Sequence, residues 1–582
     1  MKIGLIGINK YAKFLNFACD LHIYAFQQFL AQHGYESTVL DYKPVSYGAF
    51  DMRHPVDYAE SRLRETIART PKSSKDLVAQ TKDARKWAEL TVGYRSVAAE
   101  RAVRYDKFAE FIRGNLIFTD RVYDSDLLEV EDPGFDAYMC VTDVIWQSVP
   151  KYVFDRGFLL GSKAFEGKPK ISYAASRGAS SDFTDAEAEL FFDYLADIDA
   201  ISVRERDFGE YIEAHSPYQA PVVLDPVMLH DKPFWQKVSV KPAEERFVLL
   251  YYVMEGSADT IQKAVEYARL HDLTLVELSD RPTKFGKVTD SDIRHVSRYD
   301  VGMDEWLGYI EHAEAVFTNS FHGCCFSVLF EKTFYVGSRN GQKVPNFLAT
   351  FGLSDRRFGH GADVSTFDPT IDYDAVRVIL DERRRESGGF VLDALKRAEA
   401  RTDADREREH ERAEQKRRAL TYPARFHNGR PAGEATVDRS LSDEKVKVIR
   451  HAGGGVEYET PGTRYVNDGT ATVQKLLFQR PGYEFLGWTL RFRVDNRWFW
   501  CLDDGSIAEG DTTGAVLDGR KAVIPEGGSV PHLPVTHVSQ AVFVARWRST
   551  SILGRVRDAL DRPRLLAGAA VRNRSASRSS SR

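Results

Sequence analysis

The stretch TNSFHGCCFS, residues 318–327, contains a histidine in a position that suits chemistry. Apolar residues flank it on both sides, which predicts that His322 lies where a strand ends and a helix begins. Free N–H groups at a helix N-terminus favour an anion, and Gly323 would allow backbone and ligand to come close. Because histidine titrates near working pH, His322 could pass a proton to a phosphate or carboxylate compound. The alternative is a buried histidine satisfied by backbone groups.

Arg204 occupies a junction of the same kind in AISVRERDFGEYI, residues 200–212. This run predicts a strand that leads into a helix, with Arg204 between them. A guanidinium there suits bidentate contact with a phosphate or carboxylate. The alternative is an ion pair between Arg204 and a neighbouring carboxylate, Glu205 or Asp207.

Three more polar residues follow predicted strands. Arg339 and Lys343 lie on the glycine-containing loop of VGSRNGQKVPNFL, and simple solvation would explain at least one of them. Asp143, in CVTDVIWQSVP, is either a base that orients an acceptor or a helix cap.

Several chemistries lack their motifs. The chain has no Gly-x-Gly-x-x-Gly fingerprint after its first strand, no Walker-type loop and no Gly-x-Ser-x-Gly elbow. Cys324 and Cys325 adjoin His322, but adjacent cysteines at a helix start are poor metal ligands and suit packing. We therefore expect neither a metal nor a cofactor.

Composition limits the class of protein. The 582 residues are 43% hydrophobic and carry a net charge of −5, and residues 546–582 alone contribute +8. The acidic remainder argues against nucleic-acid binding. Five cysteines without a CxxC pair, no signal-peptide pattern and no apolar stretch of about 20 residues predict a soluble, cytoplasmic protein.

The order of apolar and polar runs predicts two α/β lobes followed by smaller parts. Ligands in such sheets bind at the carboxyl ends of strands. The expected parts are an N-terminal lobe at 1–235 with a helical insertion at about 54–115, a second lobe at 241–390, a charged helical linker at 391–430, a β-rich module at 431–548, and a basic, partly disordered tail at 549–582.

The run VGMDEWLGYIEHAEAVFTNSFHGCCFSVLFEKTFYV, residues 301–336, resembles the most recognisable segment of the polysaccharide pyruvyl transferase family. AISVRERDFGEYI, KISYAASRG and VVLDPVML match other segments in the right order, so that the resemblance covers about residues 1–390. It implies two Rossmann-like lobes similar to a GT-B fold. It also implies phosphoenolpyruvate as donor, and a pyruvate ketal on a sugar of a cell-surface polysaccharide as product.

Carried onto this chain, the resemblance implies that His322 is the catalytic histidine and Arg204 a donor-binding arginine in a site of the second lobe. Ser320 and Phe321, next to Gly323, would line the same pocket. Some members have arginine where Ser320 stands, so Arg339 or Lys343 would supply that cation here. The N-terminal loop INKYAKFLN departs from the Gly, Asn and Asp of many members.

Two other functions stay open at this point. One is a GT-B glycosyltransferase that uses a nucleotide sugar. The other is a non-catalytic carbohydrate-binding protein whose β-rich module, with its RPGYEFLGW stretch, is the binding unit. For an enzyme the expected partners are phosphoenolpyruvate and a nucleotide- or lipid-linked saccharide. The basic tail offers peripheral contact with an anionic membrane at its inner face, with a solvated helix or disorder as alternatives.

Overall fold

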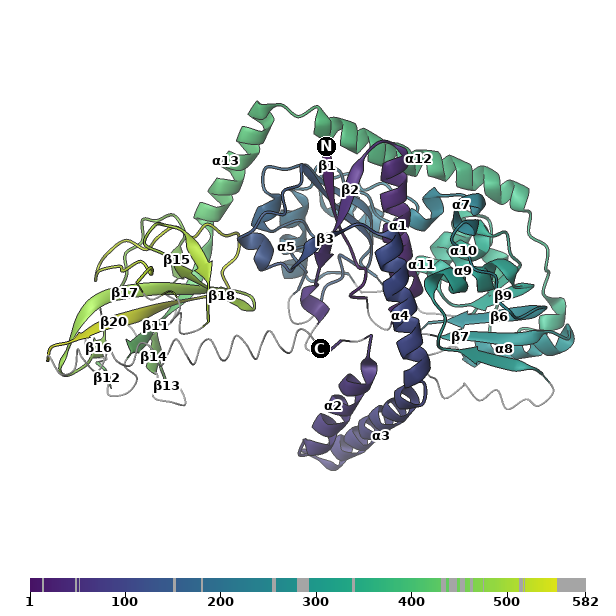
Figure 1. Cartoon of the computed structure of the whole chain (residues 1–582), viewed down its shortest axis with the longest axis horizontal. Coiled ribbons are helices and arrows are strands. Elements are labelled where there is room, and N and C mark those ends of the chain that lie inside the picture. Colours follow the sequence, from purple (N-terminus) through teal and green to yellow (C-terminus); the bar gives the residue numbers. More distant parts are fainter. Residues whose placement is uncertain are drawn as a thin grey trace. The chain divides into compact units, whose positions relative to one another are not determined.

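The structure is a computed structural model of the whole chain (Figure 1). It divides into two compact units, the first formed by residues 1–125, 133–161 and 168–401, the second by 126–132, 162–167 and 402–582. The residues described are 1–12, 15–47, 50–51, 53–149, 153–178, 182–253, 258–279, 293–337, 341–430, 436–438, 447–450, 456–460, 464–474, 476–511, 517 and 519–551.

The N-terminal lobe of the first unit is built on a five-stranded parallel sheet in the order β3-β2-β1-β4-β5. Its inner strands are almost wholly buried, which explains why they read as continuous apolar runs. The strands are β1 Lys2–Ile6, β2 Glu36–Tyr42, β3 Phe118–Tyr123, β4 Ala137–Asp143 and β5 Lys170–Ala175. The flanking helices are α1 Phe17–Gln32, α5 Asp185–Leu195 and α6 Arg206–His215.

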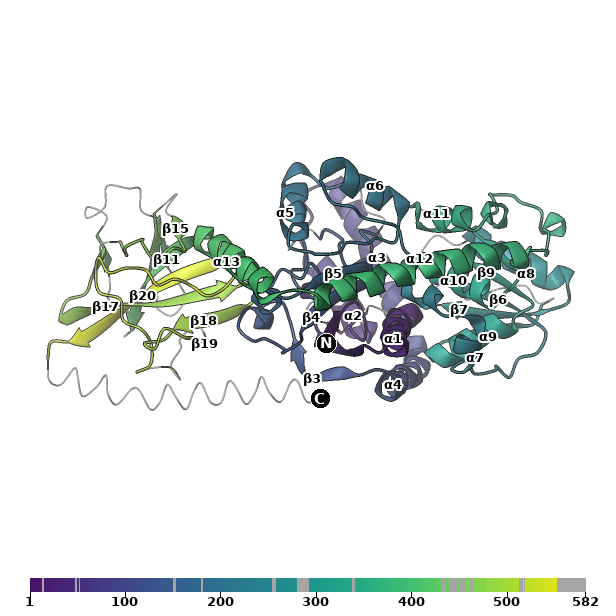
Figure 2. The ribbon, with the colours of Figure 1, turned by 90° about the horizontal axis from the view of Figure 1, so that it is seen from above.

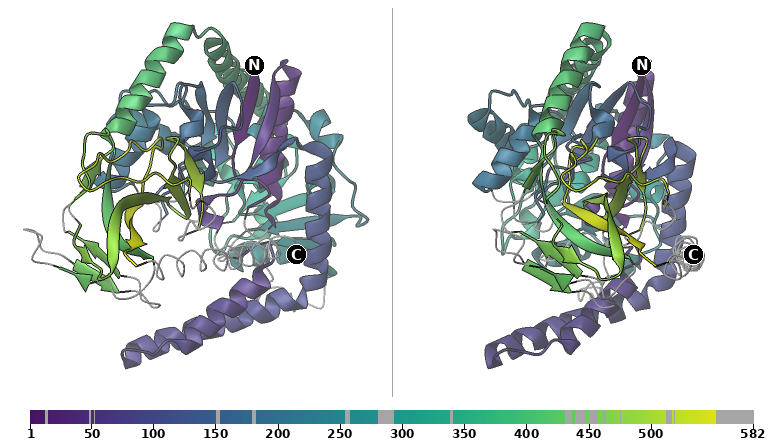
Figure 3. Two further views of the ribbon diagram at one scale, coloured as in Figure 1. Left: turned by 60° about the vertical axis from the view of Figure 1, so that its left-hand side comes forward. Right: turned by 90° about the vertical axis from the view of Figure 1, so that its left-hand side faces the viewer.

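Three helices are inserted between β2 and β3, in the segment where the sequence predicts a helical insertion. They are α2 Pro55–Ala68, α3 Ser74–Ser96 and α4 Ala98–Asn115. Ser73 caps α3 through a bond from the backbone N–H of Asp76, and Pro55 starts α2. Figure 3 shows α2 and α3 side by side as a hairpin that projects from the N-terminal lobe.

The second lobe repeats the plan with the parallel order β10-β9-β6-β7-β8. Its strands are β6 Phe247–Tyr252, β7 Thr274–Ser279, β8 His295–Arg298, β9 Ala315–Thr318 and β10 Phe334–Val336. Its helices are α8 Ala258–Leu270, α9 Met303–His312, α10 Phe321–Leu329 and α11 Lys343–Thr350, and α7 Lys232–Gln236 precedes the lobe. The expected pair of Rossmann-like lobes is therefore confirmed.

The two lobes share one hydrophobic core. Phe17 at the start of α1 stacks on Trp306 of α9, with ring centroids 5.3 Å apart. The long helix α12, Tyr373–Glu399, contacts both lobes, since Ser387 accepts a bond from the backbone of Leu224 and Tyr373 donates to the carbonyl of Lys332. Figure 2 shows α12 extending from the first sheet across the second lobe. The carboxyl edges of the two sheets are thus held in one unit.

The second unit contains α13, Asp403–Ala419, and a β-rich sheet in the order β13-β14-β11-β20-β17-β18-β19, with β15 paired to β11. Trp488 of the RPGYEFLGW stretch is fully buried in its core beside Phe426, so this aromatic packs the module. The strands are β11 Thr421–Arg430, β12 Thr436–Val437, β13 Lys447–Arg450, β14 Val456–Glu459, β15 Arg464–Val466, β16 Phe478–Gln479, β17 Tyr483–Val494, β18 Arg497–Cys501, β19 Ile507–Glu509 and β20 Gln540–Ser549.

The expected boundaries of this unit need two corrections. The β-rich part begins at 421 and not at 431, because Tyr422, Ala424 and Phe426 alternate inward on β11, a period of two that follows directly on the charged helix. The segments 126–132 and 162–167, assigned by sequence to the N-terminal lobe, belong here. Glu129, for example, accepts bonds from the backbone and hydroxyl of Thr536.

Among the described residues, no helix combines the length and apolar character needed to cross a bilayer. The basic tail from residue 552 onward lies outside the described residues, so the expectation for it stays a prediction.

Candidate active site

Polar side chains from both lobes meet around one buried carboxylate, that of Asp225. Its Oδ2 accepts a bond from Nη1 of Arg204 at 2.7 Å and lies 3.4 Å from Nε2 of His322. Its Oδ1 accepts from the backbone N–H of Val227, which makes Asp225 the N-cap of the turn Pro226–Leu229. Asp225 was not among the site residues expected from the sequence. Its one local signal is an aspartate before a proline in VVLDPVML.

Charges determine the ionisation of Asp225. Burial alone would raise the pKa of its carboxyl, but the imidazole of His322 and the guanidinium of Arg204 outweigh that effect and hold the pKa well below its usual range. Asp225 is therefore an anion that links Arg204 and His322. This link joins the two residues that the sequence ranked highest.

Arg204 is held by three carboxylates. Besides Asp225, its Nε donates to Glu205 at 3.0 Å and its Nη2 to Asp143 at 3.4 Å. Only 2% of the side chain is exposed, and the guanidinium carbon lies 4.7 Å from the ring centroid of Phe321. The ion pair with Glu205 that the sequence left open is present, whereas Asp207 pairs with Arg177 instead.

His322 follows β9 in the first turn of α10, as expected, and 10% of its side chain is exposed. Its Nε2 faces Asp225, and its Nδ1 makes no hydrogen bond to the described part of the chain. The ring is therefore not satisfied by backbone groups.

Ser320 and Gly323 build the turn that carries His322. The Ser320 hydroxyl caps α10 by accepting a bond from the backbone N–H of Gly323 at 3.3 Å. A Cβ at position 323 would lie 2.5 Å from Oγ1 of Thr318, so glycine is required by packing against the chain itself. Both residues position the histidine. Phe321 lines the pocket described below, whereas Ser320, His322 and Gly323 are not among its lining residues.

Asp143 stands at the strained end of β4. Thr142 and Asp143 have φ angles of 40° and 60°, in the left-handed region that non-glycine residues rarely occupy. No helix follows directly, so the capping interpretation of Asp143 is wrong. Burial opposes its ionisation, but Arg204 and Lys343 hold its pKa well below the usual range, and Nζ of Lys343 lies 4.0 Å away.

A second histidine, His22 on α1, lies close to the site and was missed by the sequence analysis. Its ring centroid is 6.2 Å from that of His322, it is fully buried, and its Nε2 bonds the carbonyl of Ile8 at 3.0 Å. Burial lowers its pKa to about 4, so the ring is neutral at physiological pH. Its neighbour Cys19 donates to Asp143 at 3.6 Å.

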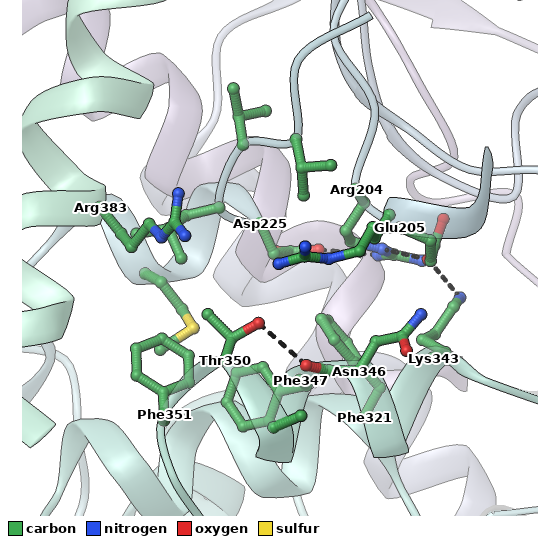
Figure 4. Close-up of a pocket in the computed structure, with 16 residues that line it drawn as sticks. Arg204, Glu205, Asp225, Phe321, Lys343, Asn346, Phe347, Thr350, Phe351 and Arg383 are labelled. Carbon is green, nitrogen blue, oxygen red and sulfur yellow. Dashed lines mark hydrogen bonds and ion pairs between the residues drawn. The ribbon is translucent and has the colours of Figure 1, made fainter. Parts of the chain in front are cut away.

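A pocket of about 210 Å³ adjoins this cluster (Figure 4). Four cationic side chains and two carboxylates line it, together with the rings of Phe321, Phe347 and Phe351. The cations are Arg204, Arg206, Lys343 and Arg383, and the carboxylates are Glu205 and Asp225. Carboxylates outside the lining offset part of this charge, because Asp143 pairs with Arg204 and Lys343, and Glu386 pairs with Arg383. A lining of arginine and lysine side chains suits a small anion. Arg339, the other cation proposed from sequence, lies outside the described residues.

In the part of the chain that the structure describes, no three His, Cys, Asp or Glu side chains are placed to hold a metal ion. Cys324 and Cys325 are fully buried in the core, and burial raises the pKa of both thiols.

Comparison with solved structures returns weak overall similarities. MurG of Acinetobacter baumannii is 11% identical with a TM-score of 0.30, over 68% of this chain and 99% of MurG. UDP-GlcNAc 2-epimerase of Methanocaldococcus jannaschii is 10% identical with a TM-score of 0.34, over 68% and 99%. The Neisseria meningitidis epimerase bound to UDP-GlcNAc is 9% identical with a TM-score of 0.35, over 68% and 100%. A search of curated proteins gave no significant match.

The comparison with family descriptions is decisive. The description "Polysaccharide pyruvyl transferase" matches residues 19–339, more than half of the chain. The match contains most of α1, including His22, together with the Arg204 junction, Asp225 and the whole turn that carries His322. The chain therefore belongs to the polysaccharide pyruvyl transferase family.

Proposed function

We propose that this protein transfers the pyruvate unit of phosphoenolpyruvate to two hydroxyl groups of a sugar. The product would be a pyruvate ketal in the synthesis of a cell-surface polysaccharide. Membership of the family supports this activity. The observation that carries it is the Arg204–Asp225–His322 link beside a pocket lined by four cationic side chains. We further propose that the reaction takes place in the cytoplasm on a nucleotide- or lipid-linked saccharide.

The donor fits the charges of the pocket. Phosphoenolpyruvate has a phosphate and a carboxylate on three carbons, and such groups favour guanidinium and ammonium partners. A guanidinium has five N–H bonds, and the three carboxylates around Arg204 use three of them. Arg204 would offer the other two to the donor, while Lys343, 3.7 Å from Glu205 at the rim, adds a second cation.

His322 would act as the acid and the base. Its imidazolium gives a proton to the methylene carbon of phosphoenolpyruvate, which becomes a methyl group and leaves C2 electrophilic. A sugar hydroxyl then adds to C2 and returns its proton to the imidazole. Phosphate leaves with the electrons of the C2–O bond, and a second hydroxyl closes the ketal while the departing phosphate takes its proton. Asp225 would hold the ring through Nε2, which leaves Nδ1 to face the donor.

The test is a donor assay on the full chain. Phosphoenolpyruvate is supplied with a panel of nucleotide- and lipid-linked sugars, and released phosphate and the ketal methyl signal are measured. A parallel assay with UDP-sugars measures UDP. Ketal formed together with an equal amount of phosphate is the expected result. Release of UDP without any phosphoenolpyruvate-dependent product would contradict the proposal and identify a glycosyltransferase.

Lys343→Ala tests the donor contact. Loss of one cation should raise the KM for phosphoenolpyruvate about 10-fold, equivalent to one hydrogen bond between charged groups, and should change kcat less. Lys237→Ala, an exposed lysine beyond α7, is the matched control and should leave both constants unchanged. An unchanged KM in the Lys343 variant would remove this lysine from the donor site.

A further inference from the structure

The hairpin of α2 and α3 has apolar side chains exposed at its outer end. We define the hairpin tip as residues 62–82, the end of α2, the turn and the start of α3. Ile67, Leu77 and Val78 lie there with 64%, 51% and 70% of their surface exposed. Single exposed apolar residues are common on soluble proteins, whereas three strongly exposed ones lie in this one tip.

Hydrogen bonds hold these residues together. The amide of Gln80, which is buried, donates to the carbonyls of Thr66 and Arg69, at 2.6 Å each. Arg69 in turn pairs with Asp76 at 2.7 Å. The last turn of α2 is therefore fastened to the first turns of α3. Ile67 and the Leu77–Val78 pair stay exposed on an ordered end of the hairpin, not on a loose loop.

The tip is basic, although the chain as a whole is acidic. It contains six basic and two acidic residues, a net charge of +4 in a protein of net charge −5. Both acidic residues are already paired, Glu65 with Arg62 and Asp76 with Arg69. Within the described residues, the ammonium groups of Lys72, Lys75 and Lys82 have no ion-pair partner. The exposed apolar side chains thus lie among unneutralised lysines.

We propose that the hairpin tip binds an anionic lipid bilayer, with Ile67, Leu77 and Val78 inserted at the headgroup level. Apolar side chains beside lysines are the combination that interfacial membrane segments use, because insertion and attraction to anionic lipid act together. A protein partner fits less well. A stable interface buries about 800 Å² on each side, which three side chains on a narrow tip do not supply. This surface is independent of the proposed reaction, and it would place the enzyme at lipid-linked material.

Vesicle sedimentation of the full chain tests the proposal. Vesicles of phosphatidylcholine with about one third phosphatidylglycerol are compared with pure phosphatidylcholine at about 0.1 M salt. We expect at least 10-fold stronger partition onto the anionic vesicles, weakened at higher salt by screening. Leu77→Asp combined with Val78→Asp should lower that partition about 10-fold or more. Val378→Asp on α12, where valine is also 70% exposed, is the matched control and should bind like the parent chain.

Other outcomes would overturn the proposal. Failure of the parent chain to sediment with anionic vesicles would do so directly. The variant at Leu77 and Val78 could bind as well as the parent chain, while Arg572→Ser combined with Arg574→Ser loses binding. That result would show that the basic C-terminal residues, and not the hairpin tip, bind the membrane. Concentration-dependent dimers in sedimentation velocity that vanish in the tip variant, without vesicle binding, would identify a second copy as the occupant.

Discussion

Two helices that follow parallel strands each carry a histidine near the site, and the two rings have different environments. His22 lies in the second turn of α1, which follows β1, and His322 lies in the first turn of α10, which follows β9, with ring centroids 6.2 Å apart. His22 is fully buried and its Nε2 bonds a backbone carbonyl. His322 is also buried, with 10% of its side chain exposed, and faces the carboxylate of Asp225. The partner of the ring, and not its place in the fold, separates a structural histidine from a candidate acid.

The pKa of His22 shows the strength of burial. Asp225 and Asp143 both act to raise this pKa, yet burial outweighs them and lowers it to about 4. A neutral ring bonded to a carbonyl can support the loop after β1, but it has no proton to give at neutral pH. We therefore expect mutation of His322 to lower activity far more than mutation of His22, and mutation of His22 to change the pH dependence of stability.

The largest expected effect is on activity at His322. His322→Ala removes the proton donor and should lower kcat for ketal formation by about 10³-fold or more, whereas His22→Gln should lower it by less than about 10-fold. Initial rates of phosphate release, measured with a sugar that forms the ketal, distinguish the two variants. The fold of each is checked by circular dichroism.

His360→Ala serves as the control for removal of a histidine. Its imidazole is exposed, pairs with Asp259 at 3.0 Å and lies outside the site, so its removal should leave the rate unchanged. Full turnover in the His322 variant, or equal losses of kcat at positions 22 and 322, would contradict the prediction that only His322 acts as the acid.

Sequence alone predicted His322 and Arg204, but it did not predict His22 or Asp225. His322 and Arg204 were found because each interrupts an apolar strand-to-helix pattern, which is a local signal. His22 is surrounded by the apolar residues of LHIYAF and reads as part of a buried helix face. Asp225 reads as the end of a strand before a proline. The contact of Asp225 with His322 spans 97 residues of sequence, and His22 approaches His322 from a still more distant part of the chain, which no local pattern encodes.

The same holds for the fold, whose local patterns could be predicted from the sequence while its long-range pairing could not. The two lobes were predicted because buried parallel strands give long apolar runs separated by amphipathic helices. The strand β11 was missed, because Pro423 interrupts its short alternating run and the run follows directly on a charged helix. Its place in the sheet comes from pairing with β20, more than 100 residues later.

The next effect is expected at Asp225, which distinguishes the environment of His322 from that of His22. Asp225→Asn keeps the size of the side chain but removes the anion between Arg204 and His322. We expect kcat to fall about 10²-fold, since the ring loses its charged partner. We also expect the free energy of unfolding to fall by about 3 kcal/mol, as when one member of a buried ion pair is removed. Turnover assays and urea unfolding measure the two effects.

Asp259→Asn is the matched control, because Asp259 pairs with the exposed His360. The same aspartate–histidine contact at the surface should contribute less than about 1 kcal/mol and nothing to turnover. Similar losses of stability and full activity in the Asp225 and Asp259 variants would contradict this prediction. The Arg204–Asp225–His322 contact would then have no catalytic role, and Asp225 would not distinguish His322 from His22.

The smallest expected effect is a change in the pH dependence of stability at His22. In the unfolded chain this histidine takes up a proton near pH 6.5, whereas in the folded chain it does so only near pH 4. Lowering the pH from 7.5 to 5 therefore favours the unfolded chain by about 2 kcal/mol through this residue. His22→Gln, whose amide can still donate to the carbonyl of Ile8, should lose about 2 kcal/mol less stability over the same interval in urea unfolding.

Other groups that titrate in this pH range cancel in the difference between the two proteins. Burial lowers the pKa of His230 to about 4 and raises that of Asp20 to about 7, and both residues are present in the parent and in the variant. Equal pH dependence of the parent chain and of His22→Gln would mean that His22 can be protonated in the folded state. His22 would then be a second acid beside His322. Both histidines could donate a proton, and His22 would not be a purely structural residue.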